Sequence, residues 1–280
     1  MQLSTTFLRL LINGLAYVSQ ELSAKLSYPI WTKTARHPMP EKEKSVYESA
    51  IKKTIQVNGC NIMTYSWCIE ERCPLILLLH GWNGRGTQLT GMIERLCENG
   101  YGVVSFDGKG HGLSDGNHTN LMELVAIVQM LQKEYGGFYA MIGHSFGVMV
   151  AVNSIYRGVV CKKIIGISPP TDFNDLLYVF SNYLGLNKKA RQALVDYVLK
   201  KLNIESFESI SITGIAPKLS MSCLLIHDEN DERVPLPQAQ RAVEVWSGAK
   251  LHITQGLGHV RILHKPAVLN LCLEFLKADS

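Results

Sequence analysis

The sequence has few features of a nucleic-acid-binding or disulfide-stabilised protein. Its 280 residues contain no run of five basic residues and carry a net charge of only +4, so nucleic-acid binding has little support. No Cys-x-x-Cys motif occurs, and the seven cysteines are scattered and odd in number. We therefore predict free thiols in a reducing, cytoplasmic compartment. No residue spacing is typical of a metal site, and neither a metal nor a cofactor is predicted.

The chain also lacks an apolar segment long enough to cross a bilayer. The apolar stretch near its start, from Leu8 to Val18, is interrupted by Arg9, Asn13 and Gly14. The residues before it are polar rather than basic, unlike those of a signal peptide. We predict no transmembrane span and an amphipathic helix packed on the domain, with peripheral membrane contact as the alternative.

The chain does contain enough apolar residues for a sizeable core, with 46% hydrophobic and 19% charged residues. Residues 1–44 are predicted to form an N-terminal helix and a linker, because the segment from His37 to Lys44 carries two prolines and several charges. Residues 45–280 are predicted to form one α/β domain. Asn58-Gly59 lies between two segments of alternating polarity, which predicts a β-hairpin there.

From Leu75 onward, apolar strands alternate with helical segments. The run from Leu75 to Leu79 is continuously apolar, which is typical of a strand buried on both faces. Further strands are predicted at residues 101–106, 138–142, 163–167, 223–227 and 250–254. This alternation indicates βαβ units and a mostly parallel sheet flanked by helices. Residues 172–212 show mostly helical patterns, so we predict a helical insertion that caps the active site.

The segment from Gly143 to Gly147 has the sequence Gly-His-Ser-Phe-Gly, which matches G-x-S-x-G. It follows an apolar strand and opens an apolar helical segment, as a nucleophile elbow requires. In such a tight turn the serine takes a strained backbone conformation, and glycines two residues away on either side prevent a collision. We therefore predict Ser145 as a catalytic nucleophile beside a helix N-terminus. The alternative is a tight turn without chemistry.

A serine hydroxyl needs a base, and the base needs a carboxylate to orient it. When the serine lies in such an elbow, the acid and then the histidine follow along the chain. His259 follows the last predicted strand in Gly-Leu-Gly-His and is the candidate base. A surface-loop histidine is the alternative interpretation. The other histidines are worse placed, because they precede the serine, lie inside the elbow, or come too early or too late.

The acid is predicted in the loop after the strand at residues 223–227, which contains four acidic residues. Asp231 lies at the tip of this loop, before Val234-Pro235, whereas Asp228 is too close to the strand. Asp228 and Glu229 remain alternatives to Asp231.

Two backbone N–H groups are predicted to bind the oxyanion. One belongs to Phe146, directly after the nucleophile, and the other to Trp82 in the glycine-rich loop that begins at His80. Gly81 lets this backbone turn close to a substrate. The loop is not a phosphate loop, because neither G-x-x-x-x-G-K-[ST] nor G-x-G-x-x-G occurs. A second glycine-rich loop, at residues 107–114, is expected to be structural.

Together these blocks resemble the α/β-hydrolase superfamily over residues 54–276. The chain looks most like uncharacterised bacterial serine hydrolases with His-Gly-Trp-x-Gly-Arg, Gly-His-Ser-Phe-Gly and Gly-Leu-Gly-His-x-Arg-Ile-Leu blocks. The resemblance implies an α/β-hydrolase fold, a helical cap, and a triad of Ser145, Asp231 and His259. Haloalkane dehalogenases and epoxide hydrolases of this superfamily carry aspartate at the elbow, so Ser145 argues against both activities.

The predicted function is hydrolysis of an ester, thioester or amide bond through an acyl-enzyme on Ser145, as in a carboxylesterase. A carbon–carbon bond hydrolase or an acyltransferase with the same triad is one alternative. A non-catalytic binding protein that keeps the fold is another, although a binding pocket does not need a strained serine. The expected partner is a small ester-like molecule. The sequence specifies neither its acyl chain nor an oligomeric state.

Two arginines are candidates for substrate binding. Arg85 lies three residues after Trp82, and Arg261 lies two residues after His259. Both loops are expected at the carboxyl edge of the sheet, where ligands bind in open α/β folds. A guanidinium there would pair with a substrate carboxylate or phosphate. The alternative is that each arginine holds its own loop by binding backbone carbonyls or a nearby acid.

Overall fold

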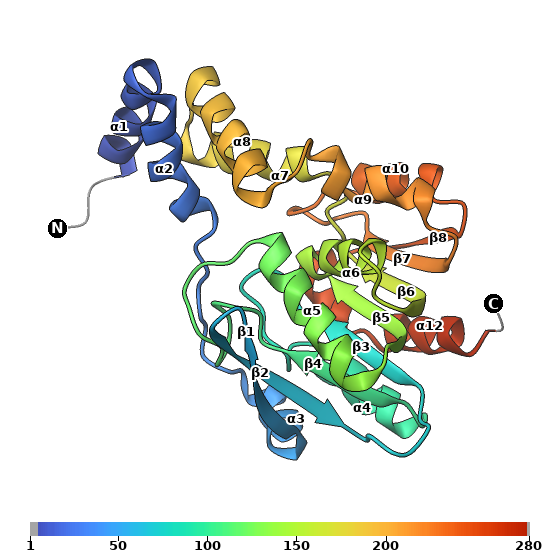
Figure 1. The fold of residues 1–280 in the computed structure, drawn as a ribbon. Helices are drawn as coiled ribbons and strands as arrows, with labels where there is room; N and C mark the ends of the chain where they lie inside the picture. The colour runs from blue at the N-terminus through green and yellow to red at the C-terminus, as the bar shows by residue number, and fades with distance from the viewer. Residues whose placement is uncertain (1–4, 279–280) are drawn as a thin grey trace. The chain divides into compact units, whose positions relative to one another are not determined.

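The computed structural model describes residues 5–278. Its central sheet has eight strands in the order β1-β2-β4-β3-β5-β6-β7-β8 (Figure 1). The strands are β1 (Ile51–Val57), β2 (Cys60–Trp67), β3 (Leu75–Leu79), β4 (Gly102–Phe106), β5 (Phe138–His144), β6 (Cys161–Ile167), β7 (Ser222–Asp228) and β8 (Ala249–Thr254). The pairs β1–β2 and β2–β4 are antiparallel, and the other neighbouring pairs are parallel. The predicted mostly parallel sheet is therefore confirmed.

The sheet begins with the predicted hairpin. Asn58 and Gly59 have positive φ angles of 49° and 76°, as both central residues of a type I′ turn must. Val57 pairs with Cys60 directly across the turn. The Asn-Gly dipeptide thus fixes the register of β1 and β2.

The chain divides into two compact units. Unit 1 comprises Met1–Lys33 and Asp172–Ser211, and unit 2 comprises Thr34–Thr171 and Ile212–Ser280. Unit 2 contains the whole sheet. It also contains the helices α3 (Glu41–Ser49), α4 (Thr90–Glu98), α5 (Leu121–Tyr135), α6 (Phe146–Tyr156), α9 (Ile212–Ile215), α10 (Pro237–Val245), α11 (Gly258–Arg261) and α12 (Pro266–Lys277), and the 3-10 turns η2 (Ala216–Lys218) and η3 (Ile262–His264). The helix α3 begins inside the segment that the sequence led us to expect as a linker.

Helices cover both faces of the parallel strands, which explains why those strands are apolar at nearly every position. On one face, alternate strand residues such as Ile165 and Ile167 join a buried cluster with side chains of α4 and α12. Gly166 lies between them and faces the opposite side. A Cβ atom placed on Gly166 would lie 2.8 Å from a Val148 methyl group of α6. The absence of a side chain at Gly166 therefore lets α6 pack closely on the second face.

Unit 1 consists of helices from two distant parts of the sequence. They are α1 (Thr5–Val18), α2 (Gln20–Trp31), α7 (Phe173–Leu184), α8 (Lys188–Leu202) and the 3-10 turn η1 (Glu208–Ile210). α2 packs on α8, and α1 packs on both. The Asn13 amide donates a hydrogen bond to the Gly185 carbonyl and accepts one from the Asn187 N–H, both at 2.9 Å. The N-terminal segment and the predicted insertion therefore form one helical body.

The insertion is helical, as predicted, with no strand in residues 172–211. Over residues 5–278, no helix combines the length and the apolar character needed to cross a bilayer.

A disulfide joins Cys68, just after β2, to Cys97 in α4. The prediction that the cysteines are free thiols is wrong for this pair. The two residues are 29 positions apart in the sequence, and folding places their Cα atoms 5.7 Å apart, within the range that a disulfide requires. Sequence spacing could not reveal this pairing, because β3 and its loop lie between the two cysteines. The cytoplasmic location stays a prediction. The expectation that all seven cysteines are free thiols no longer supports it.

Thiol titration tests the disulfide. Unfolded protein that has not been reduced should present five thiols to Ellman's reagent, from Cys60, Cys73, Cys161, Cys223 and Cys272. Reduction should raise the number to seven and lower the free energy of unfolding by about 2–4 kcal/mol. A variant with Cys68→Ala and Cys97→Ala is the control, because reduction should change neither its thiol number nor its stability. Finding all seven thiols without a reductant would contradict the bond.

Candidate active site

The predicted elbow is present where β5 ends at His144 and α6 begins at Phe146. Between them, Ser145 has φ 52° and ψ −124°, a backbone conformation that L-residues rarely adopt. A Cβ atom on Gly143 would lie 2.7 Å from the Val148 nitrogen, and one on Gly147 would lie 2.7 Å from the His80 carbonyl oxygen. Side chains at both positions are therefore excluded by backbone atoms, as the sequence pattern predicted.

The loop after β3 runs directly beside the elbow. A Cβ atom on Gly81 would lie 3.0 Å from the Ser145 Cβ, so the backbone leading into Trp82 passes next to the serine. The rings of Trp82 and Phe146 meet edge to face, with 5.3 Å between their centroids. The two residues predicted to supply oxyanion N–H groups are thus brought together beside Ser145.

His259 and Asp231 form a hydrogen-bonded pair. The distance between His259 Nδ1 and Asp231 Oδ2 is 2.7 Å, and the two side chains are 8% and 0% exposed. The other carboxylate oxygen of Asp231 accepts hydrogen bonds from the N–H groups of Arg233 (2.9 Å) and Val234 (3.0 Å). Burial alone would raise the pKa of Asp231, but the hydrogen bonds from His259 and these backbone groups lower it below its usual value. The carboxylate therefore stays charged next to the imidazole.

The alternative acid, Asp228, has a different set of contacts. One of its carboxylate oxygens accepts hydrogen bonds from the Thr254 hydroxyl (2.7 Å) and the Leu257 N–H (3.0 Å). The other accepts one from the Asn230 N–H at 3.0 Å. Asp228 thus ties the loop after β7 to the loop that carries His259. Its contacts position this loop rather than the imidazole ring.

His144, which sequence reasoning set aside, links the elbow to the base. Its Nε2 lies 2.9 Å from the backbone carbonyl oxygen of His259, and its side chain is buried. Burial and the neighbouring His259 ring lower the pKa of His144 to about 3. His144 is therefore neutral near pH 7 and donates its Nε2–H to this carbonyl. Its place between Gly143 and the nucleophile was the only signal of this role in the sequence.

No hydrogen bond joins the Ser145 hydroxyl to the His259 imidazole in the described part of the chain. The Ser145 hydroxyl does not cap α6, and it forms no hydrogen bond within residues 5–278. The structure thus brings together the candidate acid and the candidate base, and it places the two oxyanion candidates beside Ser145. Contacts of this kind are often long before a substrate binds.

A buried carboxylate, Asp107, fixes the rim loops. It accepts hydrogen bonds from the Tyr65 hydroxyl (2.8 Å), the Gly86 N–H (2.7 Å) and the Leu113 N–H (2.7 Å). Nearby, His80 Nε2 accepts a hydrogen bond from the Gly108 N–H at 2.9 Å. These bonds join the loop after β3 to the loop after β4, which is consistent with a structural role for residues 107–114.

Both candidate substrate-binding arginines donate hydrogen bonds to backbone carbonyls. Arg85 donates hydrogen bonds to the carbonyls of His37 (2.8 Å) and Pro38 (3.1 Å), and its Nε lies 3.6 Å from the Glu43 carboxylate. Arg261 donates a hydrogen bond to the Gly256 carbonyl at 3.0 Å. Both side chains make the loop-holding contacts of the alternative interpretation, and their substrate-binding roles stay predictions.

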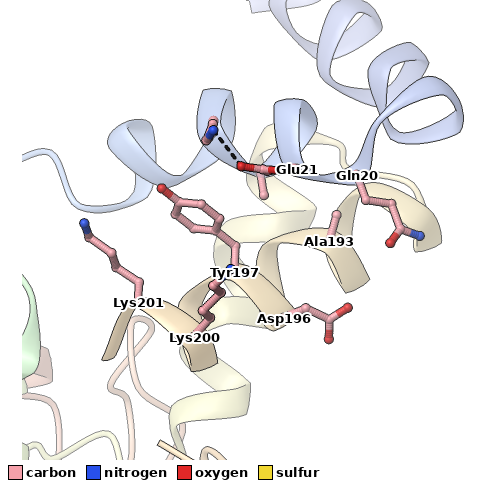
Figure 2. Close-up of a pocket in the computed structure, with 9 residues that line it drawn as sticks. Gln20, Glu21, Ala193, Asp196, Tyr197, Lys200 and Lys201 are labelled. Carbon is pink, nitrogen blue, oxygen red and sulfur yellow. Dashed lines mark ion pairs between the residues drawn. The ribbon is translucent and has the colours of Figure 1, made fainter. Parts of the chain in front are cut away.

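Unit 1 has a pocket of its own between α2 and α8 (Figure 2). It is lined by Gln20, Glu21, Ala24, Lys25, Ala193, Asp196, Tyr197, Lys200 and Lys201. Lys25 forms an ion pair with Glu21 at 2.6 Å. This set of residues contains neither a serine nor a histidine, so it offers no chemistry for acyl transfer. Within residues 5–278, no cluster of three His, Cys, Asp or Glu side chains could hold a metal ion.

Replacing each of the two buried acids separately by asparagine tests the assignment of Asp231 as the candidate catalytic acid. Asp231→Asn should lower kcat for p-nitrophenyl esters on the order of 10⁴-fold, because the amide favours the wrong histidine tautomer. Asp228→Asn should mainly lower the melting temperature, since it weakens a loop anchor. Glu229→Gln, in the same loop but exposed, is the control and should change neither quantity. A larger loss of kcat for Asp228→Asn than for Asp231→Asn would contradict the assignment.

Comparison with protein families places the chain among known hydrolases. The model of the Hydrolase_4 family, described as serine aminopeptidase S33, matches residues 70–212. This match covers just over half of the chain.

Curated relatives are more distant. The chain is 25% identical over 241 residues to the lysophosphatidylserine lipase ABHD12 of Danio rerio, covering 76% of this chain and 61% of the lipase. It therefore spans less than two thirds of that relative. It is 24% identical over 264 residues to the non-heme chloroperoxidase of Streptomyces lividans, covering 76% of this chain and 94% of the peroxidase.

Solved structures share the fold. The esterase Pf2001 of Pyrococcus furiosus aligns with a TM-score of 0.63 and 20% identity, covering 88% of this chain and 96% of the esterase. The esterase EaEST of Exiguobacterium antarcticum aligns with a TM-score of 0.63 and 16% identity, covering 81% of this chain and all of the esterase. With the family match, these alignments lead to one conclusion: the chain belongs to the serine aminopeptidase S33 family of α/β-hydrolases.

Proposed function

We propose that this hydrolase cleaves an ester, thioester or amide bond through an acyl-enzyme intermediate. The observation that carries the proposal is the Asp231–His259 hydrogen bond of 2.7 Å, in a loop tied by His144 to the elbow that presents Ser145. A base held by a buried carboxylate and a serine in a strained turn are the two parts that acyl transfer needs.

In the proposed mechanism, the Ser145 hydroxyl attacks the substrate carbonyl carbon while His259 Nε2 takes its proton. The oxyanion that forms accepts hydrogen bonds from the N–H groups of Trp82 and Phe146. His259 then gives the proton to the leaving group, which departs as the acyl-enzyme forms. A water molecule, activated by the same imidazole, hydrolyses the acyl-enzyme and frees Ser145.

Asp231 supports this cycle in two ways: its negative charge stabilises the His259 imidazolium, and its hydrogen bond fixes the tautomer of His259. Its carboxylate accepts the Nδ1–H of His259, which leaves Nε2 unprotonated for the serine proton. When His259 becomes an imidazolium, the adjacent negative charge stabilises it. His144 remains neutral because of burial, so it adds no competing positive charge beside the base.

The residues around Ser145 favour a substrate with a neutral acyl group. The Trp82 ring contacts both Phe146 and His111, with centroid distances of 5.3 Å and 5.6 Å. The two arginines considered as anion binders are already bonded to backbone carbonyls. An aromatic wall, with the guanidinium groups of Arg85 and Arg261 bonded to backbone carbonyls, suits an uncharged acyl chain better than an acidic one.

Labelling with a fluorophosphonate tests the nucleophile. Wild-type protein should be labelled and should hydrolyse p-nitrophenyl esters, whereas Ser145→Ala should lose the label and about 10⁴-fold or more of kcat. Ser168 is a matched control, because it also follows a sheet strand with a positive φ of 50°. Ser168→Ala should keep both label and activity. Labelling of Ser145→Ala, or activity within tenfold of wild type, would overturn the proposal and favour a binding protein.

Kinetics of Arg85→Gln test the preference for neutral acyl groups. Because Arg85 holds His37, Pro38 and Glu43, its loss should lower the melting temperature. Any change in kcat/KM should be equal for a neutral ester and for one with a free carboxylate. A selective loss on the acidic ester, of about 1.5–3 kcal/mol in transition-state stabilisation, would show that Arg85 binds substrate.

A further inference from the structure

The helix α1 exposes an apolar stripe. Leu10, Leu11, Tyr17 and Val18 are 62%, 38%, 66% and 85% exposed, and with Gly14 they recur at helical spacing. On the opposite side of α1, Ile12 and Ala16 are buried. We call the exposed set, residues 10, 11, 14, 17 and 18, the outer stripe. A helix that is apolar on both sides usually has a second apolar environment.

Exposed apolar side chains are concentrated in unit 1. This unit contains about a quarter of the chain, yet it holds more than half of the large hydrophobic side chains that are exposed. Single exposed apolar residues need no explanation, whereas a continuous patch marks an interaction surface.

Basic residues border the outer stripe along one edge. On α1, Arg9, Asn13 and Tyr17 are four residues apart and form the adjacent row. Arg9 packs against Gly185, and Asn13 bonds to Gly185 and Asn187 as described above.

At the end of this row, the Lys189 ammonium lies 4.4 Å from the centre of the Tyr17 ring. The start of α8 thus brings Lys189 next to the stripe, and Lys188 precedes it in the chain. No acidic residue occurs in α1.

We propose that the outer stripe of α1 binds the surface of an anionic phospholipid bilayer. Apolar side chains beside tyrosine and basic residues are typical of a helix that lies in the membrane interface. The apolar side chains enter the acyl boundary, and Arg9, Lys188 and Lys189 face the lipid phosphates and carboxylates.

The positive charge along the edge of the outer stripe favours a lipid surface over a second copy of this chain as the partner. Two copies joined by a twofold axis would bury the same patch of both chains, and α1 carries no acidic residue that could pair with Arg9 or Lys189 of the other copy. The α1 helix of a second copy would therefore offer the basic edge no opposite charge. An anionic lipid surface supplies the opposite charge along the whole edge.

Co-sedimentation with vesicles tests the proposal on the full chain. Vesicles of phosphatidylcholine mixed with phosphatidylserine should bind the wild type, and vesicles of phosphatidylcholine alone should bind it about tenfold or more weakly. The double variant Leu10→Asp/Val18→Asp should lose about tenfold or more in partitioning to the mixed vesicles. The matched control Ile51→Asp/Val160→Asp places the same charges on exposed apolar positions of unit 2, and it should bind like wild type.

Circular dichroism shows whether Leu10→Asp/Val18→Asp folds. If it does not, a second variant still tests the proposal. Lys188→Gln/Lys189→Gln leaves α1 intact and should weaken binding to the mixed vesicles about tenfold. Equal binding by all variants, or no binding by the wild type, would overturn the proposal. So would a wild-type dimer that Leu10→Asp/Val18→Asp converts to a monomer while vesicles bind neither protein, because the stripe would then join two copies.

Discussion

The site depends on a close contact between the start of α6 and the end of β3. Gly147 lies so near the carbonyls of Leu79 and His80 that no side chain fits. This approach forces the tight turn at Ser145, and the turn presents the hydroxyl beside the loop that follows β3. Because β3 has β4 on one side and β5 on the other, Ser145 lies beside the point where the strand order reverses, which is where open α/β sheets bind ligands.

Buried polar groups hold the surrounding loops in register. Asp107 joins the loops after β3 and β4, Asp228 joins the loops after β7 and β8, and His144 joins the elbow to the His259 backbone. Each group bonds mainly to backbone atoms, so it fixes where a loop runs rather than which side chain it carries. A catalytic arrangement needs this precision, because small displacements of the reacting groups greatly reduce rates.

Short sequence patterns correctly predicted the features that depend on interactions between residues close together in the chain. The continuous apolar run of β3, the Asn58-Gly59 turn and the glycines of the elbow each have a steric or burial cause within a few residues. The pairing of Asp231 with His259 was also predicted, through the order of strands along the chain. The Cys68–Cys97 bond, the contacts of Arg85 and the role of His144 depend on segments that meet only after folding. The helix α3 was missed because the two prolines before it, Pro38 and Pro40, and its own charges resemble those of a linker.

The composition of unit 1 has a consequence for synthesis of the chain. During translation, α1 and α2 emerge more than 150 residues before α8, the helix on which they pack. At a rate of about 5–20 residues per second, this delay lasts on the order of 10–30 s. Throughout that time Ile12, Ala16 and Ala24, which are buried in the folded protein, lack the part of their native surroundings that α8 supplies. The nascent chain thus presents its N-terminal helices to chaperones or lipid until α8 has emerged, and β7 and β8, which complete the sheet, emerge later still.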